Sequence, residues 1–432
     1  MRRWKGRWII IGILAIIDIY IFSVVKSVTH NSSDVLRITI YAAYWLVSGS
    51  ALLTVVLLPY VRSFRTNIIF RNYVFALLIG FFFAKIVASV FFALDDLRRG
   101  GVWVISQVFH GNGAGLIGAD GKISRSAVLS WLGIGLGGGL YGTLLYGFSN
   151  KYNYQVKHIK LAYNNLPHAF KGLKIVQISD IHSGSLQNKE AVSKGVDMIL
   201  EEKPDLILFT GDLVNDRVEE MEDYLDIFSR LHAPLGVYST LGNHDYGDYF
   251  PWPDDDEKHK DAERASGGHL FTPMQLESIE RLKQTHAKMG WRLLMNEHVV
   301  LEKGGQEIAL LGIENWGAKG HFPKYGKMSE AYAGTEKYAF KILMSHDPSH
   351  WHEEVKPKYP GIDLTLSGHT HGMQFGVELP FFKWSPVQWM YKEWAGLYES
   401  GQQKLYVNRG FGFIGYPGRV GMLPEITVIE LV

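Results

Sequence analysis

The stretch Lys174-Ile-Val-Gln-Ile-Ser-Asp180-Ile-His182 sets the pattern from which the fold of this chain follows. A short run of apolar and β-branched residues bounded by polar residues is typical of a buried strand, and here an aspartate and a histidine follow the run. The same arrangement recurs four times further along the chain. Leu206–Thr210 leads to Gly211-Asp212, Val237–Leu241 to Gly242-Asn-His-Asp245, Ile342–Ser345 to His346, and Leu364–Ser367 to Gly368-His-Thr-His-Gly372.

The residues that follow these predicted strands have the chemistry of a metal site. Loops at strand ends carry functional residues on a rigid sheet, so we expect the five segments to converge. Carboxylate, imidazole and amide groups suit Mn, Fe or Zn, whereas thiolate ligands are excluded because the chain has no cysteine. Two metals about 3.5–4 Å apart can clamp a phosphoryl group and activate a bridging water. A shared carboxylate is needed to hold two cations so close together.

Taken in order, the five segments resemble the motifs of the calcineurin-like metallophosphoesterase family. The resemblance extends from about Ile159 to the end of the chain. It is strongest to the membrane-associated bacterial branch, on the segments Asn165–Lys174 and Val407-Asn-Arg-Gly-Phe-Gly412. It implies an α/β domain built as a two-sheet β-sandwich flanked by helices, and it implies metal-dependent phosphoester hydrolysis.

The resemblance also assigns a role to each residue of the motifs. His244 would stay off the metals and act on the leaving oxygen or on charge at the phosphate, and Asp245 would orient the His244 ring. Asp212 would bridge the two metals. The remaining ligands of the first metal would be Asp180, His182 and His371, and those of the second metal would be Asn243, His346 and His369.

Each segment alone also has a structural interpretation. Asp180 and His182 could be surface loop residues, Asp212 could cap a helix or form a turn, and His346 before Asp347-Pro348 could belong to an ordinary turn. The two histidines of Gly368–Gly372 could be a structural pair. The joint occurrence favours the metal site. Histidines outside this context are interpreted as surface or core residues: His168, His232, His269, His286, His321, His350 and His352.

The first third of the chain is predicted to be a four-helix membrane bundle. Four apolar stretches of 18 to 26 residues are long enough to cross a bilayer, and they cover residues 8–25, 36–61, 73–94 and 127–148. The first has a basic start like a signal peptide but no convincing cleavage site, so it is interpreted as a retained helix. The long segment Asp95–Ser126 is predicted to be a Gly-rich loop in which Val102–Val108 is re-entrant, interfacial or plain loop.

Basic residues predict the orientation of the bundle. With the N-terminus inside, ten of them lie inside and six outside, which favours a cytoplasmic catalytic domain in a multi-pass protein of the cell membrane. The inside set is Arg2, Arg3, Lys5, Arg7, Arg62, Arg65, Arg71, Lys151, Lys157 and Lys160; the outside set is Lys26, Arg37, Arg98, Arg99, Lys122 and Arg125.

Two features inside the predicted spans suggest helix packing. The fourth span holds Gly133, Gly137 and further glycines, several of them four residues apart, which lets helices approach closely; local flexibility is the alternative. Asp18 in the first span and Lys85 in the third lie at nearly the same depth. Because ionisable groups in a membrane are usually paired, we expect these two to pair or to share a hydrated pocket.

A chain of 432 residues is long for one domain. We expect the bundle at 1–150, a linker at 151–166 and the catalytic domain at 167–432. The polar segment Asp248–Gly268 is predicted to be a solvated loop, or less readily a lid. The segment Leu379–Trp394 is dense in Trp, Phe and Tyr, which favours either a membrane interface or an ordinary core.

The sequence therefore predicts a membrane-anchored phosphoesterase that uses two metal ions, Mn, Fe or Zn. Its substrate would be a phosphate ester or diester; a lipid-linked one is favoured by the anchor, and a small soluble one stays open. The partners are this substrate and the lipid bilayer, and a net charge of +1 gives no sign of a nucleic-acid surface. The alternatives are a membrane sensor or scaffold whose domain only binds a phosphorylated ligand, and transport by the bundle.

Overall fold

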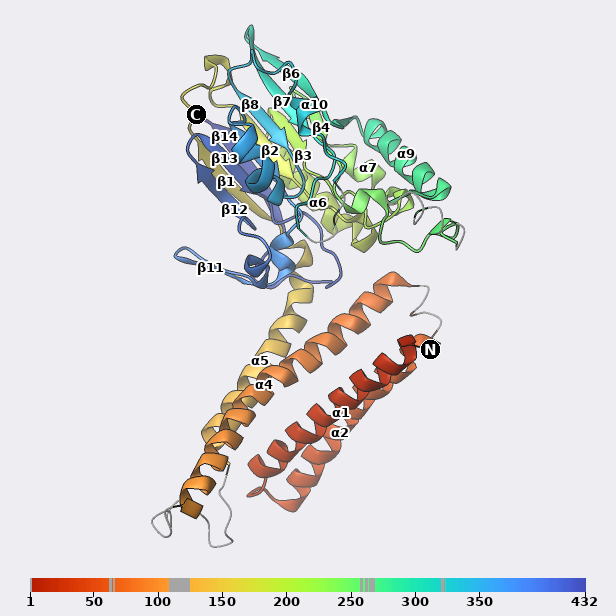
Figure 1. Cartoon of the computed structure of the whole chain (residues 1–432), viewed down its shortest axis with the longest axis vertical. Coiled ribbons are helices and arrows are strands. Elements are labelled where there is room, and N and C mark those ends of the chain that lie inside the picture. Colours follow the sequence, from red (N-terminus) through yellow and green to blue (C-terminus); the bar gives the residue numbers. More distant parts are fainter. Residues whose placement is uncertain are drawn as a thin grey trace. The chain divides into compact units, whose positions relative to one another are not determined.

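The computed structural model describes residues 2–61, 64, 67–108, 125–256, 259–260, 263, 269–319, 322 and 324–432. The chain divides into two compact units, Met1–Tyr146 and Gly147–Val432. The first unit is helical, and the second is built from β-sheets with helices beside them (Figure 1). Several residues singled out above lie outside the described residues: Arg62, Arg65, Lys122, His321 and parts of 248–268.

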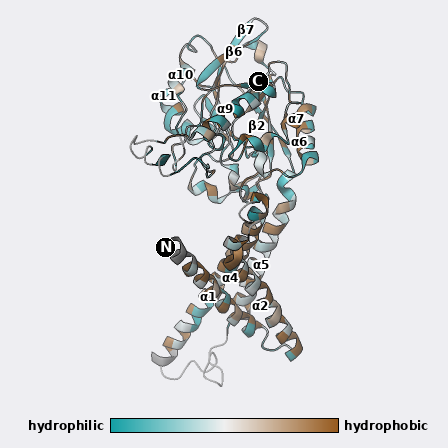
Figure 2. Ribbon diagram, turned by 90° about the vertical axis from the view of Figure 1, so that its right-hand side faces the viewer, coloured by the Kyte–Doolittle hydropathy of each residue, from teal (hydrophilic) through white to brown (hydrophobic). Residues whose placement is uncertain are grey.

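The helical unit has four helices that are long and apolar enough to cross a membrane. Their apolar character runs along most of their length, in contrast to the more polar second unit (Figure 2). Ser33 caps the second of them, because its hydroxyl accepts a hydrogen bond from the Leu36 N–H. The helices are α1 (Arg2–Val28), α2 (Asp34–Leu57), α4 (Ile68–Val108) and α5 (Ala127–Gly147).

The prediction that a loop begins at Asp95 is wrong, because α4 continues without a break to Val108. Two ion pairs at i,i+3 spacing hold the charged turn in helical form. Asp95 pairs with Arg98 and Asp96 pairs with Arg99, each at 2.9 Å. The stretch Val102–Val108 is therefore part of a helix, and the Asp-Asp-Leu-Arg-Arg sequence marks a polar turn within it.

Glycines in α5 allow close packing against α4. A Cβ on Gly133 would lie 2.5 Å from the Phe92 ring, and a Cβ on Gly137 would lie 2.8 Å from the Ala84 carbonyl oxygen. Gly135, Gly138, Gly139 and Gly142 have open space at that position. The predicted packing role is thus confirmed for the pair at spacing four, and the other glycines do not share it.

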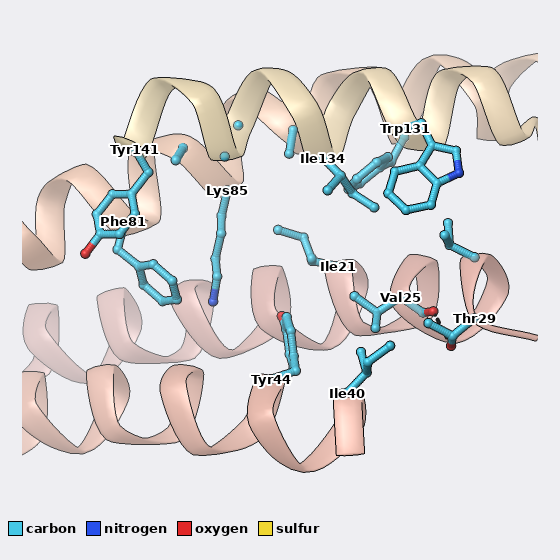
Figure 3. Close-up of a pocket in the computed structure, with 16 residues that line it drawn as sticks. Ile21, Val25, Thr29, Ile40, Tyr44, Phe81, Lys85, Trp131, Ile134 and Tyr141 are labelled. Carbon is cyan, nitrogen blue, oxygen red and sulfur yellow. Dashed lines mark hydrogen bonds between the residues drawn. The ribbon is translucent and has the colours of Figure 1, made fainter. Parts of the chain in front are cut away.

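The predicted pairing of Asp18 with Lys85 is confirmed. The Lys85 ammonium forms an ion pair with Asp18 Oδ1, and it donates to Ser48 Oγ at 2.7 Å. The hydroxyl of Tyr44 donates to the Asp18 carbonyl oxygen at 2.7 Å. Lys85 and Tyr44 both line a cavity among the four helices, in which the Lys85 side chain extends from α4 toward α1 and α2 (Figure 3).

The second unit is a sandwich of two six-stranded mixed sheets and a small ribbon. In the first sheet β2 to β5 are parallel, β14 is antiparallel to β2, and β1 is parallel to β14. In the second, β7, β8, β9 and β13 are parallel, and the edge strands β6 and β12 are antiparallel to their neighbours. The strand order of the first sheet is β1 (Gln155–Leu161), β14 (Glu425–Leu431), β2 (Lys174–Ile178), β3 (Leu206–Phe209), β4 (Val237–Ser239) and β5 (Arg292–Leu293). The strand order of the second sheet is β12 (Gly396–Ser400), β13 (Gln403–Val407), β9 (Leu364–Ser367), β8 (Lys341–Met344), β7 (Gln306–Gly312) and β6 (Glu297–Lys303). The ribbon consists of β10 (Val377–Leu379) and β11 (Phe382–Trp384).

Alternating residues of the central strands fill two separate cores. Ile175, Leu206 and Leu208 pack between the sheets, whereas Val176 and Ile207 point to the outer face of the first sheet. Helices cover that outer face and the outer face of the second sheet, which gives the predicted β-sandwich flanked by helices. The helices on the first sheet are α6 (Lys189–Glu201), α7 (Leu225–Phe228) and α9 (Pro273–Lys288). On the second sheet lie α10 (Met328–Tyr332) and a π-helical turn at Trp351–Val355, which α11 (Lys356–Lys358) continues.

Candidate metal centre

The five predicted strands are β2, β3 and β4 of one sheet and β8 and β9 of the other. Within each sheet these strands are parallel, so their carboxyl ends lie at one edge. The loops that leave these strand ends carry all seven residues that the sequence marked as ligands, and six of them come together in two groups. Sequence reasoning and geometry therefore converge on the same place in the fold.

The first group consists of Asp180, His182 and His371, all buried. The Nε2 atoms of His182 and His371 face each other at 3.0 Å, and His371 Nε2 lies 3.2 Å from Asp180 Oδ1. The first two residues come from the loop after β2 and the third from the loop after β9. Three ligand atoms thus point at one small volume from both sheets.

The second group consists of Asp212, His346 and His369. Asp212 Oδ2 lies 3.1 Å from His346 Nε2 and 3.5 Å from His182 Nε2 of the first group. One carboxylate oxygen therefore stands between the two groups, as a bridging ligand must. The other oxygen of Asp212 accepts the His244 backbone N–H at 2.9 Å, which fixes the carboxylate in this orientation.

Asn243 and His244 face the same site. The side-chain oxygen of Asn243 is buried and has no hydrogen-bond partner among the described residues, while its amide nitrogen donates to the Tyr249 hydroxyl at 3.0 Å. His244 is half-buried, its ring lies 4.9 Å from the His182 ring between centroids, and its Nδ1 bonds the Asn215 carbonyl oxygen at 2.7 Å. That bond makes Nδ1 the donor and leaves Nε2 of His244 unprotonated when the ring is neutral.

The prediction that Asp245 orients the His244 ring is wrong, since the Asn215 carbonyl does so. The Asp245 carboxylate instead accepts four backbone N–H bonds, from Asp212, Leu213, Val214 and Gly242, at 2.8 to 3.2 Å. It therefore clamps the loop after β3 to the loop after β4. Adjacency in sequence did not predict this contact, because consecutive residues in a tight turn direct their side chains to different partners.

Five of the seven residues predicted as metal ligands have a left-handed backbone conformation, which non-glycine residues rarely adopt. Their φ angles lie between 48° and 70°, and the residues are Asp180, His182, Asp212, His369 and His371. Such conformations cost roughly 1–3 kcal/mol each and cluster where function demands them. Nothing in the strand pattern of the sequence indicates this strain.

Two glycines allow the ligand loops to approach each other. A Cβ on Gly242 would lie 2.2 Å from Asp212 Oδ1, and a Cβ on Gly368 would lie 2.2 Å from Asp180 Oδ2. Any side chain at either position would displace a carboxylate. The glycines that precede Asn243 and His369 are thus part of the construction of the site.

The buried charges of the site shift one another's pKa. Burial alone lowers the pKa of His346, but the Asp212 carboxylate outweighs it and raises this pKa to about 10. Burial also works to raise the pKa of Asp212, yet the imidazoles of His346 and His244 hold it well below its usual value. Burial and the neighbouring Asp212 charge raise the pKa of Asp245 to about 7. The Asp212 carboxylate is thus anionic at neutral pH.

The sequence analysis missed two residues that support the ligands. The hydroxyl of Tyr391 lies 2.9 Å from His369 Nε2 and 3.4 Å from Asp347 Oδ2, so it connects the imidazole to a buried carboxylate. Arg419 is fully buried and donates from Nη2 to His371 Nδ1 at 3.2 Å. Neither has a motif of its own, although Tyr391 lies in the aromatic segment Leu379–Trp394. The remaining histidines belong to neither group within the described residues.

The residues present fit a pair of divalent cations. The facing imidazole nitrogens of His182 and His371, the unpartnered Asn243 oxygen and the shared Asp212 oxygen each have the position of a donor to a cation. Oxygen and nitrogen donors of this kind suit divalent metals such as Mn, Fe and Zn. In the described part of the chain, the ion pairs of Asp180 and Asp212 are all with imidazoles, and none is with a lysine or an arginine.

The fold and the site define a metal-dependent phosphoric ester hydrolase with a transmembrane region. Residues 173–373 match the family described as calcineurin-like phosphoesterase, and residues 2–151 match the one described as probable calcineurin-like phosphoesterase, transmembrane domain. An uncharacterized metallophosphoesterase of Bacillus subtilis, YkuE, is 32% identical over 272 residues, which are 62% of this chain and 81% of the relative. The chain belongs to the calcineurin-like phosphoesterase family.

Two further relatives differ in what their names state. The UDP-2,3-diacylglucosamine pyrophosphatase LpxG of Chlamydia trachomatis is 31% identical over 280 residues, 57% of this chain and 81% of the relative. A transmembrane protein with metallophosphoesterase domain from Danio rerio is 28% identical over 283 residues, 64% of this chain and 57% of the relative.

Proposed function

We propose that this protein hydrolyses a phosphate ester or diester with two metal ions bound at the carboxyl ends of the central strands. The first ion would be held by Asp180, His182 and His371, and the second by Asn243, His346 and His369, with Asp212 shared. The observation that carries the proposal is the position of Asp212 Oδ2, 3.5 Å from a nitrogen of one group and 3.1 Å from a nitrogen of the other.

The protein's own groups divide the chemistry between them. When bound, two such cations neutralise the phosphate oxygens and lower the pKa of a water for in-line attack. His244 can act on the leaving group because its side chain is half-buried and its Nε2 faces away from the Nδ1 that the Asn215 carbonyl holds. Protonated at Nε2, it would give a proton to the departing oxygen. Asp245 would hold the loops of Asp212 and Gly242 in register.

We propose a lipid-linked or otherwise amphiphilic phosphoester as the substrate class. Two considerations support it. The chain carries four helices able to span a membrane, so the site works beside a bilayer. The LpxG relatives are named as UDP-2,3-diacylglucosamine pyrophosphatases, and they match 56% and 57% of this chain.

The catalytic unit is placed on the cytoplasmic face in this proposal. The support is the excess of basic residues on the inner side, ten against six. A reporter fused after Val432 should then behave as cytoplasmic. Digestion of the catalytic unit by protease added outside intact cells would place it on the other face and change the pool of substrates.

The decisive experiment is a substrate screen with purified, Mn-loaded full-length protein in detergent. We expect turnover of a generic chromogenic phosphodiester and faster turnover of a phosphoester or pyrophosphate that bears acyl chains. Equal rates for acylated and soluble substrates would remove the lipid-linked class. Tight binding of a phosphorylated ligand with no turnover at any metal loading would instead support the sensor or scaffold.

A further inference from the structure

The segment around β10 and β11 carries a patch of exposed apolar side chains. Phe381 at the turn of this hairpin is 87% exposed and Trp389 is 75% exposed. The hairpin projects from the body of the catalytic unit (Figure 1). We call this patch the apolar rim; it consists of Val377, Leu379, Phe381, Phe382, Trp389 and Met390.

The apolar rim is not a loose loop, because it rests on a small core of its own. A buried cluster includes Val387 and Tyr391, which flank the exposed Trp389 and Met390 in the sequence, together with Trp394, Ala395 and Met422. The rings of Trp384 and Trp389 lie 6.1 Å apart between centroids in an edge-to-face arrangement. The exposed residues are therefore presented on a firm base, as a recognition surface is, and a patch of this kind marks a protein or membrane contact.

The apolar rim is also tied to the residue at which the last membrane helix ends. Gly147 is the last residue of α5 and the first of the second unit. Its carbonyl accepts the Arg419 N–H at 2.9 Å, and a Cβ on Gly418 would lie 2.8 Å from the Gly147 carbonyl carbon. The next residue, Val420, pairs with Phe375 and accepts the Gly376 N–H at 2.9 Å. Gly376 immediately precedes β10.

This short path connects the apolar rim to the last residue of α5. One backbone hydrogen bond joins Gly147, where the helix ends, to Arg419, and a second joins the next residue, Val420, to Gly376 just before the hairpin. Aromatic side chains prefer the headgroup level of a bilayer, where their rings are half in apolar surroundings. The occupant that the chain itself brings within reach of this surface is its own membrane.

The same base supports the metal centre. The Tyr391 hydroxyl contacts His369, and Ser385 Oγ donates to the Gly372 carbonyl at 2.8 Å, directly after His371. Whatever fixes the position of the apolar rim therefore fixes the position of the ligands from β9.

We propose that the apolar rim inserts into the headgroup–acyl boundary of the membrane that holds α5, and so sets the metal centre at the height of lipid phosphates. This inference stands on exposure and connectivity and does not depend on which phosphoester is cleaved. It adds a second, reversible attachment of the catalytic unit to the bilayer, beside the covalent one through Gly147.

The test uses the absence of cysteine from the chain. Phe381→Cys and Trp389→Cys each create a single thiol in the full-length protein, which can be labelled with bimane and reconstituted into phosphatidylcholine–phosphatidylglycerol vesicles. Glu307→Cys is the matched control, because Glu307 is an exposed residue at the start of β7, outside the apolar rim.

We expect brominated lipids to quench bimane at 381 and 389, with a blue-shifted emission, and to leave bimane at 307 unchanged. Equal, water-like emission at all three sites would overturn the proposal. Shielding at 381 that ignores bromination and disappears when vesicles hold a single chain would also overturn it and assign the surface to contact between two copies. Since the readout needs no turnover, failure of the proposed activity would not affect it.

Discussion

The two units of this protein treat buried charge in opposite ways. In the bundle, Asp18 meets a cation from its own chain, because Lys85 reaches it from α4. In the catalytic unit, Asp180 and Asp212 are as deeply buried, but in the described residues their ion-pair partners are imidazoles only. A charge that the chain neutralises itself serves structure, whereas carboxylates that face imidazoles, which are themselves metal ligands, are suited to a cation from outside.

The sharpest way to break this comparison is to remove the shared charge of the catalytic unit. Asp212→Asn keeps the shape but removes the anion between the two groups, so we expect activity to fall below detection and metal content to fall. Elemental analysis of the purified variant measures the metal. Two tightly bound ions in Asp212→Asn would show that the carboxylate does not bridge.

The second effect in size concerns His244. His244→Ala should lower turnover by about 10²–10⁴-fold and leave the metals bound, since its ring acts on the leaving group. Steady-state rates and metal content on the same preparation separate the two quantities. His232→Ala is the control, because His232 is exposed and bonds only the Arg230 carbonyl among the described residues; it should be silent. Loss of metal from His244→Ala would make His244 a ligand.

The third prediction concerns the bundle pair. Asp18→Asn or Lys85→Met leaves an unpaired charge in hydrocarbon, which costs about 2.5–3.5 kcal/mol. Thermal unfolding in detergent should show each single variant destabilised and the double variant partly restored. Strictly additive losses in this double-mutant cycle would mean that the two side chains do not interact.

The smallest effect is expected at Tyr391. Tyr391→Phe removes the hydroxyl that connects His369 to Asp347 but keeps the ring, so metal affinity should weaken by about 10–100-fold, as is usual for groups behind a ligand. Competition with a chelator measures it. Tyr398→Phe is the control, because among the described residues its hydroxyl accepts hydrogen bonds from the Trp394 and Ala395 N–H groups and contacts no candidate ligand. An unchanged metal affinity in Tyr391→Phe would show that the Tyr391 hydroxyl does not support metal binding and that this side chain only contributes packing.

Much of the architecture could be predicted from the sequence because its signals are local. Strand β2 and its four counterparts end within a residue or two of the predicted positions, since burial on both faces gives continuous apolar runs. The pairing of Asp18 with Lys85 followed from helix geometry alone. The extension of α4 past Asp95 did not, because a charged Asp-Asp-Leu-Arg-Arg stretch suggests the end of a span, although its i,i+3 ion pairs stabilise a helix.

The details of the site were beyond sequence reasoning for a different reason. Three of the four partners of Asp245 are backbone N–H groups of another loop, and a backbone group has no signature in a sequence. The contact of Tyr391 with His369 joins residues 22 apart through a turn whose path only the fold defines. The left-handed backbone of Asp180 and His371 is likewise a product of tertiary constraint.

One feature of the sandwich has a mechanical consequence. Each group of ligands draws on both sheets: Asp180 and His182 from the first join His371 from the second, and Asp212 from the first joins His346 and His369 from the second. Every cation bound here would therefore act as a cross-link between the two halves of the sandwich. In a chain without cysteine, such a metal cross-link takes the place that a disulfide bond could have between the sheets. A chelator would then abolish the activity and also lower the stability of the two-sheet sandwich.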